Sequence, residues 1–398
     1  VLGQKDITIN KGETAGVSGT TITTTEDSQT VTINLTKTSS DFTINLDKVE
    51  DYIDPYSLAN AIITNAKTKA NGTEFLETPK TKLAEEASAE DEEVLSITPD
   101  DYGTSYYYRG NAIDNYVNFA GMCWRTVRIV GDGSVKLILE DQDSTCATSD
   151  GNWNISTTTG GTTMKGNFGY TEYAANTLTA SDGTTNSKVL YLMNYLNGGT
   201  NNDKSMATAF KNFQTGPLAN YLDKLKAGDW CLNDKVYYAG NVTTALTSKE
   251  LLDKQVTGGT VLYYDSYVRL YIKTTKEPTL KCYGTNMNRF SDNSDMYVGT
   301  LTADEIVYAG GKVYTNNEYY YLINDYQKSN RLYFWSLSPG DSTDYSKLGD
   351  TVIDVAPNGN VGLNDVSIEA AYRPAITLKS GTQILSGNGT ISNPYIIK

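Results

Sequence analysis

The chain has 398 residues, a formal net charge of −14 and no His, and its 30 Tyr far outnumber its 8 Phe. This length predicts two or three domains, and the negative charge repels phosphate backbones, so nucleic acid is not an expected partner. Since no run of about 18 apolar residues occurs, we expect no membrane insertion. Val1 is neither an initiator Met nor the start of a signal peptide, so we expect a mature or trimmed chain.

Residues 1–48 alternate apolar and polar side chains with a period of two. The alternating runs at 7–9, 21–23, 31–35 and 42–46 predict short antiparallel strands that form a small N-terminal β module. A module of this size has a thin core and needs a covering neighbour. It either packs against its own chain or adds a strand to another copy of the protein.

Residues 49–100 are predicted to hold one helix and an acidic linker. The helix covers 54–67, where Asp54 opens it and Pro55 occupies the first turn. Acidic and small residues dominate 78–101, which is typical of a solvated linker or a loose helix.

The chain from 101 to 398 has a strand-and-turn pattern with a helical insert. Gly131-Asp132-Gly133 and Pro357-Asn358-Gly359-Asn360 predict hairpin turns between strands. Residues 187–226 are the most helical part, and Gly216-Pro217 divides them into separate helices. Beyond this region strands and turns return. The predicted class is therefore an α+β fold that is β-rich and has a few helices.

The four cysteines are Cys123, Cys146, Cys231 and Cys282. Their spacing does not fit a zinc site, and the chain has no His to complete one. We expect two disulfides, with three pairings open, and hence an oxidising, extracellular compartment.

The usual catalytic patterns are missing from the sequence. Without His no Ser-His-Asp triad can form, and no glycine-rich phosphate loop occurs. We expect no enzyme activity and no cofactor, with calcium as the one ion considered. Its candidate ligands are Asp141 with Asp143 and Asp292 with Asp295, although neither pair has the spacing of a known calcium loop.

A series of short motifs follows one another in the second part of the chain. They are Tyr106-Tyr107-Tyr108-Arg109-Gly110, Cys123-Trp124-Arg125, Trp230-Cys231, Val298-Gly299-Thr300-Leu301-Thr302-Ala303-Asp304-Glu305, Trp335-Ser336-Leu337-Ser338-Pro339 and Arg373-Pro374-Ala375-Ile376-Thr377-Leu378. In this order they resemble a family of secreted and surface proteins of gut-type Gram-positive bacteria. The C-terminal halves of that family are similar to the C-type-lectin-like fold shared with formylglycine-generating enzymes and the variable proteins of diversity-generating retroelements.

The resemblance implies a C-type-lectin-like domain over 101–398 with the disulfides Cys123–Cys146 and Cys231–Cys282. It also implies that Arg373 is buried against a carboxylate and that Trp335 packs in the core. Ligands of this fold are bound on polar loops, here in 340–372. The candidate binding residues are Asp341, Asp344, Tyr345, Asn358, Asn360 and Asn364.

The expected function is that of an extracellular structural or adhesive protein of the cell surface. It would assemble with copies of itself through the N-terminal β segment, as the subunit of a pilus-like filament. The alternative is a monomeric adhesin that binds a glycan or a host receptor through 340–372. A hydrolase that cleaves glycans with a pair of carboxylates is the most distant alternative.

Overall fold

The chain divides into an N-terminal unit, Val1–Asp54, and a C-terminal unit, Pro55–Lys398, in this computed structural model. The boundary falls at residues 54/55, beyond the predicted module of 1–48. The structure describes residues 20–24, 31–35, 56–69, 94–142, 145–153, 165–166, 178–179, 185–186, 206–228, 230–231, 235–247, 250, 261–282, 296–342, 350–365 and 370–398.

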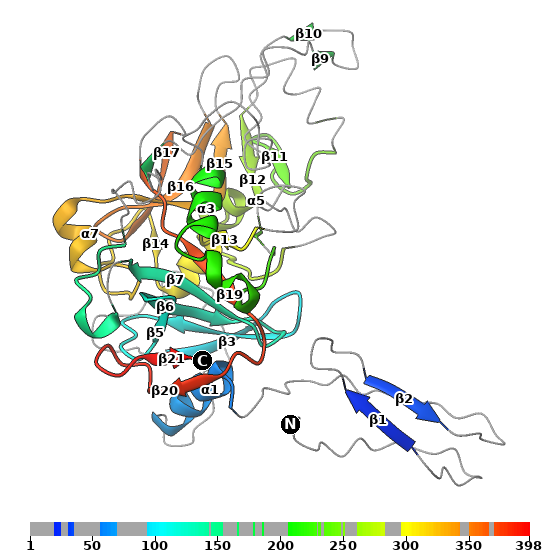
Figure 1. The fold of residues 1–398 in the computed structure, drawn as a ribbon. Helices are drawn as coiled ribbons and strands as arrows, with labels where there is room; N and C mark the ends of the chain where they lie inside the picture. Colours follow the sequence, from blue (N-terminus) through cyan, green and yellow to red (C-terminus); the bar gives the residue numbers. More distant parts are fainter. Residues whose placement is uncertain are drawn as a thin grey trace. The chain divides into compact units, whose positions relative to one another are not determined.

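The described part of the N-terminal unit is a pair of antiparallel strands, β1 (Thr20–Thr24) and β2 (Val31–Leu35). Figure 1 shows the two strands side by side, and in their register Ile22 lies opposite Ile33, as the period-two pattern requires. The strands predicted around 21–23 and 31–35 are thus confirmed. Those predicted at 7–9 and 42–46 lie outside the described residues.

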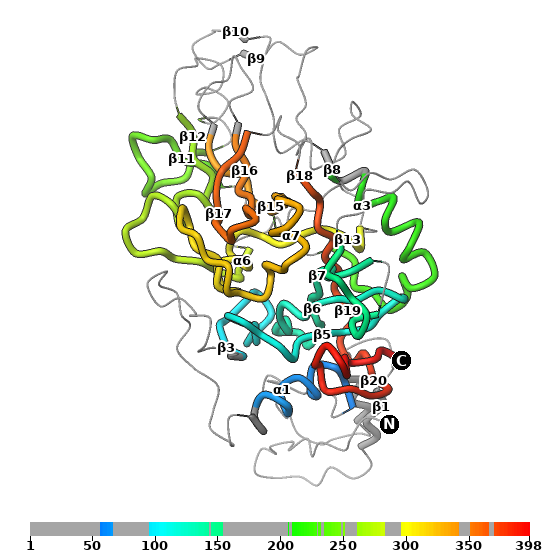
Figure 2. The backbone as a smooth tube through the Cα atoms, turned by 90° about the vertical axis from the view of Figure 1, so that its left-hand side faces the viewer, coloured from blue at the N-terminus to red at the C-terminus, as the bar shows by residue number. Residues whose placement is uncertain are grey.

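Helix α1 (Leu58–Lys69) opens the C-terminal unit and buries Leu58 and Ile62. It begins later than predicted, because Ser57 is its cap: the Asn60 N–H donates to Ser57 Oγ at 3.2 Å. The Leu58 N–H donates to the Thr382 carbonyl at 2.8 Å, which ties the start of the helix to the C-terminal segment. Figure 2 shows α1 close to the C-terminal strand β20.

The first sheet of the C-terminal unit orders its strands β13-β19-β7-β6-β5-β21-β20, with β4 paired to β6 and β3 to β4. Their bounds are β3 (Val94–Pro99), β4 (Thr104–Arg109), β5 (Tyr116–Phe119), β6 (Met122–Ile129), β7 (Val135–Asp141), β13 (Val298–Gly299), β19 (Ala375–Leu378), β20 (Ile384–Ser386) and β21 (Tyr395–Ile397). The Gly131-Asp132-Gly133 turn joins β6 to β7 as predicted. Strand β3 contradicts the prediction of a linker up to residue 100: Leu95-Ser96-Ile97-Thr98 alternates apolar and polar residues, and the strand pairs with the aromatic β4.

The second sheet follows the order β11-β12-β15-β16-β17-β14, and β18 joins β15 to β8. The bounds are β8 (Lys165–Gly166), β11 (Val236–Tyr238), β12 (Leu262–Tyr264), β14 (Lys312–Val313), β15 (Phe334–Ser342), β16 (Asp350–Val355), β17 (Asn360–Asp365) and β18 (Ala370–Ala371). The turn predicted around Asn358 joins β16 to β17. A separate pair is formed by β9 (Leu178–Thr179) and β10 (Thr185–Asn186).

Helices lie among these strands at more places than the sequence pattern predicts. Helix α3 (Met206–Thr215) and the 3₁₀ helix η2 (Ala219–Lys224) confirm the helical region and its break at Gly216-Pro217, while 187–205 lie outside the described residues. The strand-and-turn prediction beyond this region misses several helices. They are α5 (Asp265–Tyr267), the π-helical η3 (Val268–Ile272), α6 (Ala303–Ala309) and α7 (Asp325–Asn330).

Helix α6 forms because Thr302 and Glu305 make a reciprocal capping box at its start. The Glu305 N–H donates to Thr302 Oγ1 at 3.1 Å, and the Thr302 N–H donates to Glu305 Oε2 at 3.0 Å. Gly310 ends the helix with a φ of 119°, a left-handed conformation that favours glycine. These contacts fix Asp304 and Glu305 on the first turn, where both face a cleft described below.

Both disulfides join the predicted partners, Cys123 with Cys146 and Cys231 with Cys282. Trp335 is buried in the core, as expected. The two large sheets and the few helices among them confirm the β-rich α+β class. The C-type-lectin-like assignment stays a prediction. In the described part of the chain, no helix combines the length and the apolar character needed to cross a membrane.

Candidate functional site

The predicted binding residues are distributed over β15, β17 and the turn before β17. Asn358 lies in the turn, and its amide donates to Asn316 Oδ1 at 2.9 Å. Asn360 and Asn364 belong to β17, and the Asn364 amide donates to the Asp354 carboxylate. Asp341 lies on β15. Asp344 and Tyr345 fall outside the described residues, so the structure does not test them.

Asp341 adjoins a cluster of four tyrosines, Tyr263, Tyr267, Tyr271 and Tyr314, that we call the tyrosine face. The ring centroids are 5.1 Å apart for Tyr263 and Tyr267, 4.9 Å for Tyr267 and Tyr271, and 4.9 Å for Tyr271 and Tyr314. The first three follow one another at four-residue spacing through β12, α5 and η3, which places them on one side of this turn of chain. The result is a continuous row of rings.

The exposed end of this row is Tyr314, whose side chain is 61% exposed. Its φ of 54° lies in the left-handed region that non-glycine residues rarely adopt. The Tyr314 N–H donates to the Val361 carbonyl at 3.2 Å, and the Tyr271 hydroxyl donates to the same carbonyl at 3.0 Å. Strand β17 therefore holds the Tyr314 backbone and the Tyr271 hydroxyl, and non-glycine residues in the left-handed region cluster at functional sites.

The polar groups of the tyrosine face favour neutral phenols. Burial raises the pKa of Tyr267, and the nearby Tyr314 and Asp341 raise it further. Burial also raises the pKa of Asp341, although a hydrogen bond from Thr351 opposes this rise. The pKa values of Tyr271 and Tyr314 are raised by burial as well, so the phenols of Tyr267, Tyr271 and Tyr314 are protonated at neutral pH.

Beneath this region lies a buried carboxyl, Asp354 on β16, which is 1% exposed. Its register partners are Trp335 on β15 and Gly362 on β17. Burial raises the pKa of Asp354 to about 7, and the hydrogen bond from Asn364 offsets only part of that rise. A neutral amide therefore stabilises the ionised carboxylate only in part.

A second candidate is the charged cleft, which two adjoining hollows form around Arg128, Lys136, Cys231 and Leu280. Its other lining residues are Asp100, Asp101, Tyr102, Val130, Lys226, Ser266, Arg269, Thr279, Lys281, Cys282, Thr302, Asp304, Glu305, Ser338 and Thr377. The lining thus comes from both sheets, from α5 and η3, and from the first turn of α6.

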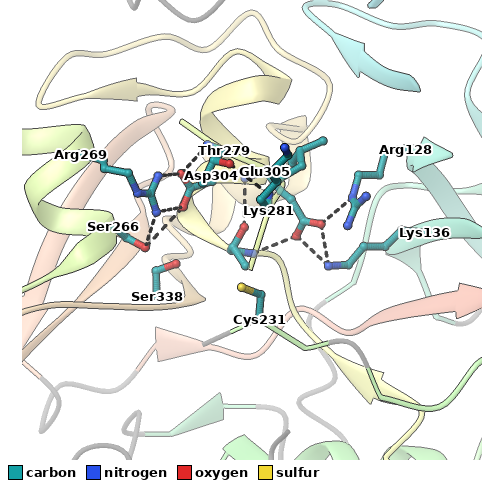
Figure 3. A pocket seen from close by; sticks show the side chains of 12 residues that line it. Arg128, Lys136, Cys231, Ser266, Arg269, Thr279, Lys281, Asp304, Glu305 and Ser338 are labelled. Atoms are coloured by element: carbon teal, nitrogen blue, oxygen red, sulfur yellow. Dashed lines mark hydrogen bonds and ion pairs between the residues drawn. The ribbon is translucent and has the colours of Figure 1, made fainter. Parts of the chain in front are cut away.

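Ion pairs hold the carboxylates of the charged cleft in place. Figure 3 shows Glu305 reaching toward Arg128 and Lys136, with Nε–Oε1 at 2.9 Å and Nζ–Oε2 at 2.7 Å. Although burial alone raises it, the pKa of Glu305 is lowered to about 2 by the Lys136 and Arg128 cations. Asp304 pairs with Arg269, whose Nε also contacts Asp265 at 2.7 Å.

Because Glu305 is held ionised, it does not suit the role of proton-donating carboxyl in a glycan hydrolase. The candidate calcium ligand Asp141 is used within the fold: it accepts hydrogen bonds from Ser149 Oγ at 3.0 Å and the Asp150 N–H at 3.1 Å. Asp143, Asp292 and Asp295 lie outside the described residues. Within the described ranges, no group of three or more Cys, Asp or Glu side chains is placed to hold a metal ion.

Sequence reasoning missed the tyrosine face and the role of α6. The four-residue spacing of Tyr263, Tyr267 and Tyr271 was the available signal for the first. The signal for the second was Thr302-x-x-Glu305, a capping-box pattern. Nothing local to Tyr314 marks it, because its neighbours in the row come from a distant segment.

Comparisons with models of known protein families, with curated proteins and with solved structures found no match to this chain. Its function is therefore proposed from the residues, their geometry and the family resemblance described above.

Proposed function

We propose that this chain is an extracellular binding protein of the bacterial cell surface, which holds a neutral glycan against the tyrosine face. The supporting observation is the row of ring contacts that ends at the exposed Tyr314, near the Asp341 carboxyl. Sugar rings have apolar faces that stack on aromatic rings, and hydroxyl groups that bond to phenols and carboxyls. Two disulfides are compatible with the extracellular location.

Charge favours a neutral ligand over an acidic one. The chain has a formal net charge of −14, and Asp341 adds a carboxyl at the face itself. Sulfated or uronic acid sugars would be repelled by both. A neutral oligosaccharide meets no such repulsion and can accept hydrogen bonds from the protonated phenols.

The test is a glycan array probed with the full chain, followed by calorimetry on the best neutral oligosaccharide. We expect Tyr314→Ala to weaken binding about tenfold, because a stacked aromatic anchor contributes about 1–2 kcal/mol. The matched control is Tyr319→Ala, which removes a tyrosine that is 58% exposed and has no ring contact with the tyrosine face. Absence of binding to any neutral glycan, or equal losses in the two variants, would contradict the proposal.

A second candidate function is assembly through the N-terminal unit, favoured by β1 and β2. These strands form a pair in a unit of their own, and in the described residues each is paired along one edge only. A two-stranded pair is marginally stable alone, and its open edges can accept strands from other copies. This arrangement would suit the subunit of a filament.

For this candidate, we expect the full chain to form polymers visible by negative-stain microscopy at high protein concentration. Thr32→Pro should abolish them, because Pro removes a backbone donor from β2 and cannot extend a strand ladder. Thr32→Ser is the control and should leave polymers intact. A wild-type chain that sediments as a monomer at every concentration would rule assembly out.

A further inference from the structure

The two disulfides of the C-terminal unit have different surroundings. Cys123 and Cys146 are both 0% exposed, and the Cys146 N–H donates to Asn118 Oδ1 at 2.8 Å. Cys231 is partly exposed and lines both hollows of the charged cleft, while Cys282 lines one of them. Figure 3 shows the Cys231 sulfur among the lining side chains. One bond is therefore sealed in the core, and the other borders a space that opens to solvent.

The charged cleft also brings cations to the accessible bond. Arg128 and Lys136 line both hollows together with Cys231. Their charges are balanced by Glu305 and Asp100, at 2.7–2.9 Å. Lys281 lines the same cleft next to Cys282 in the chain, and in the described residues its ammonium has no ion pair. Lys281 is thus a cation available to an incoming anion.

These features matter because a thiolate is the species that attacks a disulfide. The rate of this exchange depends on access to the attacked sulfur and on how well the departing sulfur carries negative charge. The cleft gives access to Cys231, and Lys281, which lines one hollow together with Cys231, attracts an anionic thiol toward that sulfur. The chain as a whole is strongly negative and would otherwise repel an anionic thiol.

We infer that Cys231–Cys282 is a thiol-exchange site, modified at Cys231 by a small anionic thiol. The thiolate sulfur attacks Cys231 Sγ, a mixed disulfide forms, and the Cys231–Cys282 bond breaks. The electron pair leaves on Cys282, which takes a proton from water. A second thiolate can attack the mixed disulfide and release Cys231, so that two thiols are oxidised and one disulfide of the protein is reduced.

The experiment exposes the native full chain to rising concentrations of glutathione at constant pH, then blocks free thiols and maps them by peptide mass spectrometry. We expect Cys231 and Cys282 to react at least tenfold faster than Cys123 and Cys146, with the glutathione adduct on Cys231. The Cys123–Cys146 bond serves as an internal standard for the folded state. Equal rates for the two bonds, faster reaction of Cys123–Cys146, or an adduct on Cys282 would overturn the inference.

A charge variant tests the role assigned to Lys281. Lys281→Glu should slow exchange with glutathione several-fold more than exchange with neutral 2-mercaptoethanol. Lys398→Glu makes the same change of charge at an exposed residue outside the cleft and should leave both rates unchanged. If Lys281→Glu unfolds the chain, Cys123–Cys146 becomes reducible in the same sample; Lys281→Gln, which removes the cation without adding an anion, then serves as a second variant and should still slow exchange with glutathione more than exchange with 2-mercaptoethanol. Equal effects of Lys281→Glu and Lys398→Glu would contradict the assigned role.

Discussion

Replacing Arg373 by Met should destabilise the C-terminal unit by about 3–5 kcal/mol, because it leaves a buried carboxylate without its cation. Arg373 is 0% exposed, and its Nη2 lies 2.8 Å from Glu140 Oε2. Its Nε donates to the Leu139 carbonyl at 2.8 Å, and Nη1 donates to the Leu322 carbonyl. The guanidinium also lies 5.5 Å from the Phe334 ring, so it joins strand β7 of the first sheet to strand β15 of the second.

Urea unfolding measures the loss, and two further variants define its cause. Lys379→Met removes a cation of similar size from an exposed position and should change the unfolding free energy by less than about 0.5 kcal/mol. Combining Arg373→Met with Glu140→Gln should recover part of the loss, because the unpaired buried charge is then gone. If the double variant is no more stable than Arg373→Met alone, the cost arises from the lost carbonyl contacts instead.

The two hairpin turns were predicted from the residues themselves, whereas the disulfide pairing and the burial of Arg373 against a carboxylate were implied by the family resemblance. The turns could be predicted because their signals are local. Gly131 and Gly359 occupy turns whose chemistry is local, and the alternating runs around them have the period of a strand. The partner of Arg373 was not predicted, because Glu140 is 233 residues away in the chain and only the fold brings the two side chains together.

The candidate sites were harder to predict, since they depend on contacts between distant segments. Asp341 and the loop residues near it were selected from polarity, yet Asn358 and Asn364 are occupied by hydrogen bonds within the fold. The tyrosine face needs Tyr314 to approach the segment from Tyr263 to Tyr271, which is a tertiary contact. Helix α6 was also missed, because the prediction relied on the spacing of apolar residues. The start of this short helix is marked by a capping box rather than by an apolar stripe.

Asp354→Asn should stabilise the protein strongly at pH 8 and only slightly at pH 4.5, by about 1 kcal/mol. Burial raises the pKa of Asp354 to about 7, whereas an unfolded Asp has a pKa of about 3.9. The folded chain therefore binds more protons than the unfolded chain between these two values. Over that window stability falls as pH rises, and above about pH 7 the loss is complete. The complete loss is on the order of 4 kcal/mol.

The amide of Asn has nearly the shape of the carboxyl, carries no charge, and can still accept the hydrogen bond from Asn364. The Tyr271 phenol, which faces Asp354, adds no titration here because burial, together with Tyr314 and Asp354, keeps its pKa well above the usual value.

Urea unfolding of wild type and variant across pH 4.5–8 isolates Asp354, since every other carboxyl is common to both chains. Asp223→Asn, at an exposed position, is the control and should follow the wild-type curve. Parallel curves for Asp354→Asn and wild type would show that Asp354 ionises in the folded chain as easily as in the unfolded one. A difference in unfolding free energy that widens from pH 4.5 to pH 7 and then stays constant would instead show that the ionised Asp354 carboxylate destabilises the fold at neutral pH beneath the tyrosine face.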